Sequence, residues 1–185
     1  MPQFPVATAG PLTKVVTLSP FPGRLHFTLA LNNRLVAPPA YKGKFGYFPI
    51  EDNRVVAYDL DSGTQRWLVE AAPLSAPAVS DELLFISQRD RISALHAADG
   101  TVAWETPFAD SLAVPLFFTD GWLLAATAGE VHAFRATDGM RVWQQPIAGA
   151  RAALAAAGNQ LYVSLNDRRV VDDIPCHAPT VTYLL

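Results

Sequence analysis

The residues that most often carry out chemistry are few in this chain and widely spaced. It has four histidines and one cysteine, namely His26, His96, His132, His177 and Cys176. A metal site needs three or four such ligands in one place. Successive residues of a strand point to opposite faces, and His96 and His132 differ in parity within the repeat described below, so we expect them to face apart. We therefore predict surface or hydrogen-bonded histidines and no metal site.

Short motifs typical of enzymes are also missing. The sequence has no glycine-rich nucleotide-binding loop, no phosphate-binding-loop lysine, no His-Glu-x-x-His, no Cys-x-x-Cys and no Gly-x-Ser-x-Gly. One cysteine cannot form an internal disulfide. We predict no catalytic residue and no cofactor, and we interpret the chain as non-enzymatic.

Composition favours a folded protein and argues against nucleic-acid binding and against a transmembrane helix. Half of the 185 residues are hydrophobic, 17% are charged and the formal net charge is -3. Such a chain can bury a core, but it lacks the basic patch that nucleic acids require. It also has no apolar run long enough for a transmembrane helix. Residues 1–13 do not form a recognisable signal peptide, so the compartment stays open: the protein is either cytosolic or a piece of an exported chain.

Three segments of 13 residues align without gaps and define a repeat. Each has an apolar residue at position 1, alanine at 3, glycine at 9 and tryptophan at 13; they are residues 55–67, 92–104 and 131–143. Their glycines are 37 and 39 residues apart. A weaker copy at 15–27 has phenylalanine in the tryptophan position. The predicted docking residues are Gly23, Phe27, Gly63, Trp67, Gly100, Trp104, Gly139 and Trp143.

After each copy come a linker and then two short apolar runs that are split by a turn. The paired runs are 37–41 and 45–48, 76–79 and 83–87, 114–118 and 122–126, and 153–157 and 161–165. A second polar turn follows each pair, at 52–53, 89–90, 128–129 and 166–167. Runs of this length with turn signals between them are typical of hairpins. Four strands in roughly 40 residues form the unit of a propeller blade.

The sequence therefore predicts an all-β fold, a β-propeller of four-stranded antiparallel blades. We expect about four blades, as an incomplete arc over residues 15–171, after an N-terminal coil at 1–14. A degenerate tail at 172–185 has neither the glycine nor the tryptophan. Residues 151–157 are alanine-rich and favour helix by propensity, but the register of the repeat predicts a strand there.

Each repeated residue has a physical reason. The glycine suits a hairpin turn that needs positive φ, and the alanine suits a close approach of two sheets. Buried between adjacent blades, the tryptophan would hide about 150–250 Å². Trp122 lies outside this pattern, and we predict that it belongs to the core.

These residues resemble the tryptophan-docking motif of the PQQ-like (pyrroloquinoline-quinone-type) β-propeller family over residues 15–171. That family includes quinoprotein alcohol dehydrogenases and the propeller lipoprotein of outer-membrane β-barrel assembly. The resemblance implies a scaffold that binds a protein partner, with a cell-envelope or periplasmic role. The alternative is a fragment of a PQQ-dependent dehydrogenase, although one cysteine excludes the vicinal disulfide that those enzymes usually carry.

Loops of a rigid scaffold are the expected place for partner binding. Asp59, His96 and Arg135 occupy one equivalent position in three blades, as a polar rim or as solvated side chains. The other candidates, in predicted turns, are Arg89, Asp90, Asp167 and Arg168. Unpaired blade edges would permit a homodimer. The open alternatives are a closed ring, in which the end strands share a blade, and an incomplete gene product.

Overall fold

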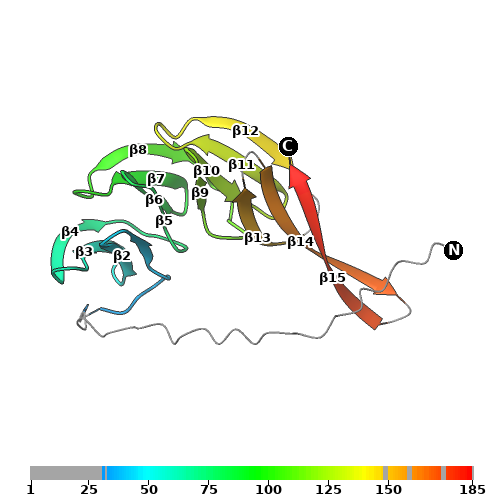
Figure 1. The fold of residues 1–185 in the computed structure, drawn as a ribbon, viewed down its shortest axis with the longest axis horizontal. Coiled ribbons are helices and arrows are strands. Elements are labelled where there is room, and N and C mark those ends of the chain that lie inside the picture. Colours follow the sequence, from blue (N-terminus) through cyan, green and yellow to red (C-terminus); the bar gives the residue numbers. More distant parts are fainter. Residues whose placement is uncertain (1–30, 32, 148–149, 158–159, 172–173, 185) are drawn as a thin grey trace, which may run out of the picture. The chain divides into compact units, whose positions relative to one another are not determined.

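The computed structural model describes residues 31, 33–147, 150–157, 160–171 and 174–184, and the elements in them are strands (Figure 1). The first sheet contains β1 (Ala40–Lys42), β2 (Phe45–Ile50), β3 (Arg54–Asp59) and β4 (Thr64–Glu70). The second contains β5 (Ala78–Val79), β6 (Leu83–Ser87), β7 (Arg91–His96) and β8 (Val102–Pro107). The third contains β9 (Phe117–Thr119), β10 (Trp122–Ala126), β11 (Glu130–Arg135) and β12 (Arg141–Pro146). The fourth contains β13 (Ala150–Ala157), β14 (Gln160–Val171) and β15 (Ile174–Leu184).

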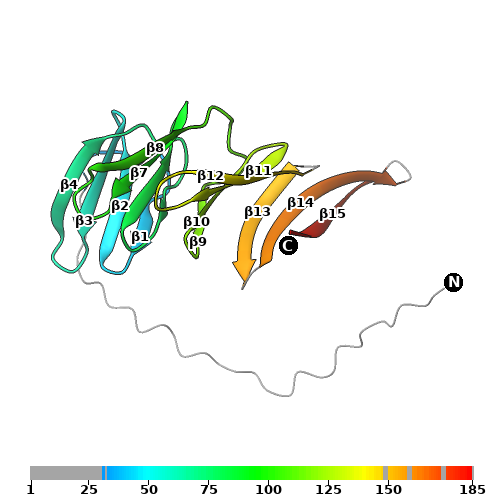
Figure 2. The same ribbon diagram turned by 90° about the horizontal axis from the view of Figure 1, so that it is seen from above.

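Every sheet is an antiparallel meander whose strands pair in chain order. The sheets follow one another along the chain (Figures 1 and 2), and their first strands β1, β5, β9 and β13 contact one another consecutively. This is the arrangement of propeller blades, with one inner strand from each blade. The predicted all-β propeller arc is confirmed. Within the described residues, no helix could cross a membrane.

The repeated alanine and tryptophan lie opposite each other across the third and fourth strands of a sheet. The register pairs Ala57 with Trp67 and Ala94 with Trp104. In the third sheet Ala133 pairs with Trp143. The register shifts directly after each of these alanines. A small residue facing a large ring beside a bulge explains why the repeat keeps both residue types at this spacing.

The repeated glycine sits in a left-handed turn, as predicted. Its φ is 70° at Gly63, 77° at Gly100 and 70° at Gly139. In each turn the glycine amide donates to a carbonyl four residues earlier, at 2.8–2.9 Å. These turns are therefore three copies of one backbone structure.

Two tryptophans dock onto the glycine turn of the following sheet. The Trp67 indole Nε1 donates to the Ala97 carbonyl at 3.0 Å, and that of Trp104 donates to the Ala136 carbonyl at 2.9 Å. A Cβ placed on Gly100 would lie 2.9 Å from the Trp67 ring. The glycine is thus required twice, for its φ and for the space that the ring fills.

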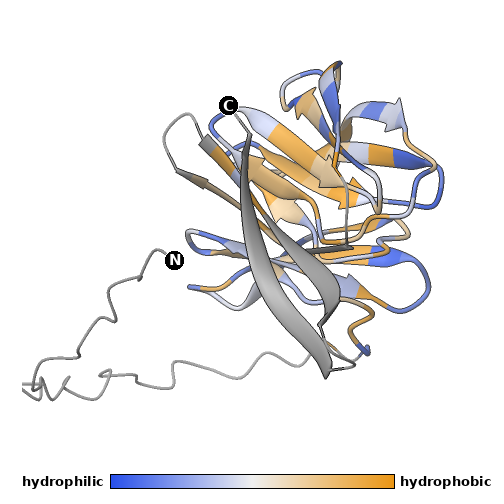
Figure 3. Ribbon diagram, turned by 90° about the vertical axis from the view of Figure 1, so that its right-hand side faces the viewer, coloured by the Kyte–Doolittle hydropathy of each residue, from blue (hydrophilic) through white to orange (hydrophobic). Residues whose placement is uncertain are grey.

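Apolar clusters fill the spaces between consecutive sheets. Tyr47 and Trp67 of the first sheet pack with Leu84 and Ile86 of the second. Phe85 of the second packs with Phe134 of the third in a second cluster. A third cluster joins the third and fourth sheets and contains Leu124, Val131, Leu161 and Val163. In Figure 3 the hydrophobic residues concentrate along the strands and the hydrophilic ones at many of the turns.

Two tryptophans differ from expectation. Trp143 was predicted to be buried like its two counterparts, but it is 37% exposed, against 7% for Trp67. Trp122 was predicted in the core, but it is 39% exposed, because it starts β10 directly after the turn at Gly121 and lies at the end of the apolar stripe of that strand.

The fourth sheet also differs in detail. The turn predicted at 166–167 is wrong, because those residues lie inside the long strand β14. The tail that lacks the repeat forms β15, which pairs with β14 along its length. The alanine-rich segment is strand β13, so the register of the repeat predicted it better than helix propensity did. The predicted coil 1–14 and the repeat copy 15–27, with Gly23 and Phe27, lie outside the described residues.

Candidate functional site

A cavity of about 530 Å³ opens at the end of the second sheet where β6 turns into β7. Its walls come from this turn and from the linkers that join the second sheet to its neighbours. A volume of this size lies in the range of ordinary binding pockets. We call it the linker cavity, and its lining residues are Leu74, Ser75, Ser87, Gln88, Arg89 and residues 108–115.

Backbone hydrogen bonds fix both linkers to the sheets. The Leu74 amide donates to the Ser87 carbonyl at 2.9 Å, and the Phe108 amide donates to the Asp90 carbonyl at 2.9 Å. Farther along the second linker the Ala113 amide donates to the Ala126 carbonyl at 2.7 Å. The cavity wall is therefore held by the scaffold at three points.

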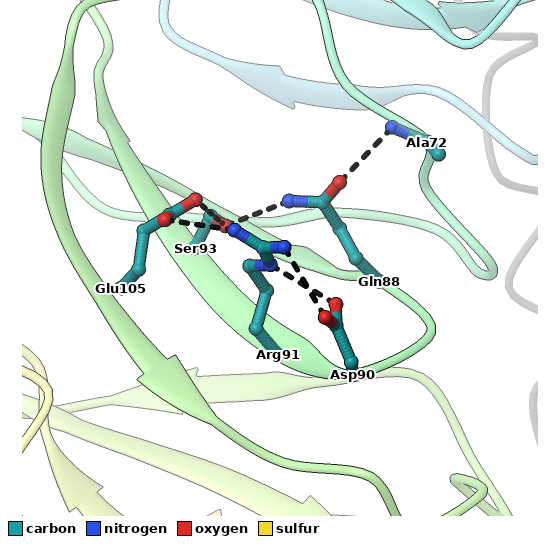
Figure 4. A network of polar contacts seen from close by, with 6 residues as sticks. All are labelled: Ala72, Gln88, Asp90, Arg91, Ser93 and Glu105. Carbon is teal, nitrogen blue, oxygen red and sulfur yellow. Dashed lines mark hydrogen bonds and ion pairs between the residues drawn. The ribbon is translucent and has the colours of Figure 1, made fainter.

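A network of polar side chains supports the turn beside the cavity (Figure 4). Gln88 accepts from the Ala72 amide at 3.3 Å and donates to Ser93 Oγ at 2.7 Å, and Ser93 donates to Glu105 at 2.9 Å. Arg91 lies between two carboxylates and donates to Asp90 and to Glu105, at 3.0–3.2 Å. The network joins the first linker, the turn and β8.

Arg91 forms ion pairs with both carboxylates of this network. The hydrogen bond from Arg91 lowers the pKa of Asp90, and the two carboxylates raise the pKa of Arg91. Arg89, by contrast, is exposed on the cavity wall and makes no ion pair with the described residues. It is therefore the cation available to a bound partner, whereas Asp90 is already engaged.

The predicted partner residues fall at two ends of the sheets. Arg89 and Asp90 lie in the β6–β7 turn, whereas Asp59, His96 and Arg135 end their strands at the opposite side. Five residue steps along β7 separate those ends by about 17 Å. The structure thus places Arg89 on the wall of the linker cavity, with Asp90 next to it in the turn, and it places the other three residues beside the glycine turns.

Asp59 has a structural role that the sequence did not reveal. It is only 6% exposed, forms an ion pair with Lys44 at 2.9 Å and accepts from the amides of Asp61 and Ser62. These contacts, first of all the one with Lys44, lower the pKa of Asp59. A buried carboxylate engaged in this way stabilises its own turn, so the expectation of a polar rim or solvated position is wrong here.

The remaining candidates differ in what surrounds them. Arg135 is exposed and forms an ion pair with Asp138 at 2.7 Å, and His96 is exposed. Asp167 and Arg168 lie in β14, opposite residues 178 and 177 of β15. They were predicted in a turn, and their side chains lie outside what the structure describes.

His132 is a buried polar residue. It is 2% exposed, and neither ring nitrogen makes a hydrogen bond with the described residues. Its Nε2 lies 3.4 Å from a Glu130 oxygen, and its ring packs edge-on to Phe108 at 5.2 Å between centroids. No hydrogen bond to a described residue offsets this burial, so the prediction of a surface or hydrogen-bonded histidine is wrong for His132.

Side chains that could ligate a metal ion lie apart in the described part of the chain. Among the residues that the structure describes, no three of the ligand-type side chains His, Cys, Asp and Glu gather as a metal site would need. The single cysteine leaves no partner for a disulfide within the chain.

Sequence reasoning missed most of the linker cavity. Of the lining residues it identified Arg89 but neither Leu74 nor residues 108–115, which form most of the wall. The signal that could have found them is a proline at or near both ends of each linker, at 73 and 77 and at 107 and 115. Prolines that frame short apolar segments indicate extended, fixed linkers.

Comparison with known proteins identifies one family. A family model described as "Outer membrane protein assembly factor BamB" matches residues 5–111 and 88–172, which is most of the chain. A search of the curated proteins found no match.

Several solved structures share the fold. BamB from Moraxella catarrhalis aligns over 71% of this chain and 47% of its own, with 18% identity and a TM-score of 0.59. The computationally designed Ika4 protein aligns over 85% of this chain and 96% of its own, with 12% identity and a TM-score of 0.66. Quinohemoprotein alcohol dehydrogenase from Comamonas testosteroni aligns over 73% of this chain and 29% of its own, with 14% identity and a TM-score of 0.58. The chain therefore spans about half the length of the BamB structure.

Proposed function

Because the chain belongs to the outer membrane protein assembly factor BamB family, we propose that it is a non-catalytic propeller scaffold that binds a protein partner at the linker cavity. The family model covers all three well-formed repeats. We also propose a cell-envelope role for the chain, in the assembly of outer-membrane proteins. The description of the family supports this role.

The observation that carries the proposal is the composition of the linker cavity. Its wall combines apolar side chains, including Leu74 at 67% exposure, with serine hydroxyls and the guanidinium of Arg89. A chain segment of a partner offers the matching groups, namely apolar side chains, backbone hydrogen-bonding groups and a carboxylate. Fixed walls lower the ordering cost of binding.

A site-specific photo-crosslink tests the proposed site. A photoreactive residue at Ser111, an exposed part of the cavity wall, should crosslink to one discrete protein from bacterial cell-envelope extract. The matched control is the same residue at Ala98, exposed in the glycine turn at the other end of the second sheet. Equal crosslinking at both positions would refute a site at the cavity.

A charge and polarity change should then weaken that crosslink. Arg89→Glu combined with Leu74→Asp removes the available cation and the exposed apolar side chain; both residues are exposed, so we expect the fold to tolerate the change. Truncated hot-spot residues typically cost at least about tenfold in affinity. An unchanged crosslink in this variant would contradict the assignment of these residues.

A further inference from the structure

Phe108 belongs both to the linker cavity and to the apolar cluster between the second and third sheets. It is 6% exposed and forms part of the cavity wall. Its ring packs edge-on to His132, with 5.2 Å between centroids, and edge-on to Phe134 at 5.9 Å. The rings of His132 and Phe134 stack at 6.5 Å. Each of the three rings therefore contacts the other two, and a shift of His132 acts on the wall through Phe108.

His132 is the polar member of these three rings. It is 2% exposed, and neither ring nitrogen makes a hydrogen bond with the described residues. A buried imidazole without a hydrogen-bonded partner is more stable neutral than charged. Burial is accordingly the main cause that lowers the pKa of His132. At neutral pH an uncharged imidazole therefore packs against Phe108.

The charged side chains that act on His132 come from three elements. Glu130 of β11 has an oxygen 3.4 Å from Nε2, and Asp110 lies in the linker; both favour the protonated imidazole. Arg141 of β12 opposes it. Neither carboxylate hydrogen-bonds to the ring, so a protonated His132 gains an acceptor only if the groups around it move.

The linker is the part of this neighbourhood that can respond. β11 carries His132 and pairs with β10 on one side and with β12 on the other. The linker is held to the sheets by the Phe108 and Ala113 amides, and residues 109–111 between them are exposed. A charge on His132 therefore acts on a wall segment that can move without opening a sheet.

We propose that His132 makes partner binding at the linker cavity sensitive to pH. In its neutral form the imidazole supports Phe108 and, through it, the cavity wall. Protonation draws the ring toward the carboxylates of Glu130 and Asp110, displaces residues 108–115 and so weakens binding. This inference rests on the proposed function for the partner, whereas the movement of the linker does not depend on a partner.

Amide NMR of the free chain between about pH 4.5 and pH 7.5 tests the movement of the linker. The signals of residues 108–115 should shift with the same midpoint as the His132 imidazole. These shifts should be absent in His132→Leu, which keeps an apolar side chain beside Phe108. They should persist in His96→Leu, which replaces an exposed histidine. Linker signals that do not follow His132, or an imidazole that stays neutral over the whole range, would overturn the proposal.

The protein that crosslinks at Ser111 extends the test to binding. Its apparent dissociation constant should rise about twofold at the His132 midpoint and about tenfold one pH unit below it, because only the chain with neutral His132 binds. His132→Leu should remove this rise, and His96→Leu should keep it. An equal rise in both variants would overturn the proposal, because groups other than His132 would then cause it.

The two measurements separate this inference from the proposed function. If no protein crosslinks at Ser111 more than at Ala98, the proposed function fails, and the amide signals still decide whether His132 moves the linker.

Discussion

At the scale of single residues, the same side chain has different roles according to its surroundings. Trp67, with its ring on Gly100, is nearly buried, whereas Trp143, at the same repeat position, is exposed. The sequence predicts the docking position, but exposure depends on whether the next sheet supplies a glycine turn. His132 is the opposite case, a polar residue buried without partners in its part of the structure.

Truncating these two tryptophans should have unequal effects on stability. Trp67→Ala should lower the free energy of unfolding by about 3–5 kcal/mol, because it leaves a cavity between two sheets. Trp143→Ala should lower it by less than Trp67→Ala does, because Trp143 is 37% exposed, against 7% for Trp67, and so buries less of its ring. Urea unfolding at low protein concentration measures both, and similar losses would show that Trp143 is also docked within the chain.

His132 should make folding stability depend on pH. Burial lowers the pKa of His132 below 6.5, while Glu130 and Asp110 raise it and Arg141 lowers it. A lowered pKa means that the folded protein binds the proton less readily than the unfolded chain does. Stability is therefore complete above about pH 6.5 and is lost as the pH falls through the folded-state pKa.

Thermal unfolding between about pH 7.5 and pH 5.5 measures this dependence. His132→Leu should make the melting temperature depend less on pH at the acid end of this range, because the buried imidazole that resists protonation is gone. The exposed His96 provides the control, and His96→Leu should keep the slope of the wild type. If both variants keep the wild-type pH dependence of the melting temperature, His132 is not its source.

At the scale of elements, one strand–turn–strand unit repeats three times with the same bulge and the same glycine turn. Its turn carries two constraints, backbone conformation and space for a ring. Gly139 is subject to both, since a Cβ there would overlap the Trp104 ring, whereas Gly121 has a φ of 81° and open space around it.

Asparagine at these two glycines separates the constraints. Both substitutions place a residue that tolerates positive φ, so any difference reports the overlap with the ring. Gly139→Asn should lower the free energy of unfolding by about 1–3 kcal/mol more than Gly121→Asn, as overpacked sites do. Equal effects in urea unfolding would mean that the turn, and not the docked ring, is what requires glycine.

At the scale of the whole molecule, the repeat predicts more of the fold than of the site. The positions of Gly100 and Trp104 predict strand count, turn conformation and the contact between sheets, because all three depend on short-range spacing. The linker cavity depends on how two linkers far apart in the sequence approach Arg89, which no local pattern encodes. The strand at 174–184 was missed because it pairs without the repeated glycine and tryptophan.

The quinoprotein alternative predicts a ligand effect that the scaffold does not. If the chain is a scaffold, PQQ with calcium should leave the melting temperature of the purified chain unchanged; the described residues hold no cluster of ligands for the calcium ion. Ligands that bind the folded state alone raise its stability by mass action. A rise in melting temperature that saturates with PQQ would therefore favour the enzyme.

The central claim is that a protein binds at the linker side of the sheets. Amide hydrogen exchange of the chain, with and without the protein that crosslinks at Ser111, measures it most directly. Binding should slow exchange at residues 87–89 and 108–115 and leave residues 60–63, 97–100 and 136–139 unchanged. Protection confined to those glycine turns, with none at the linkers, would contradict the account.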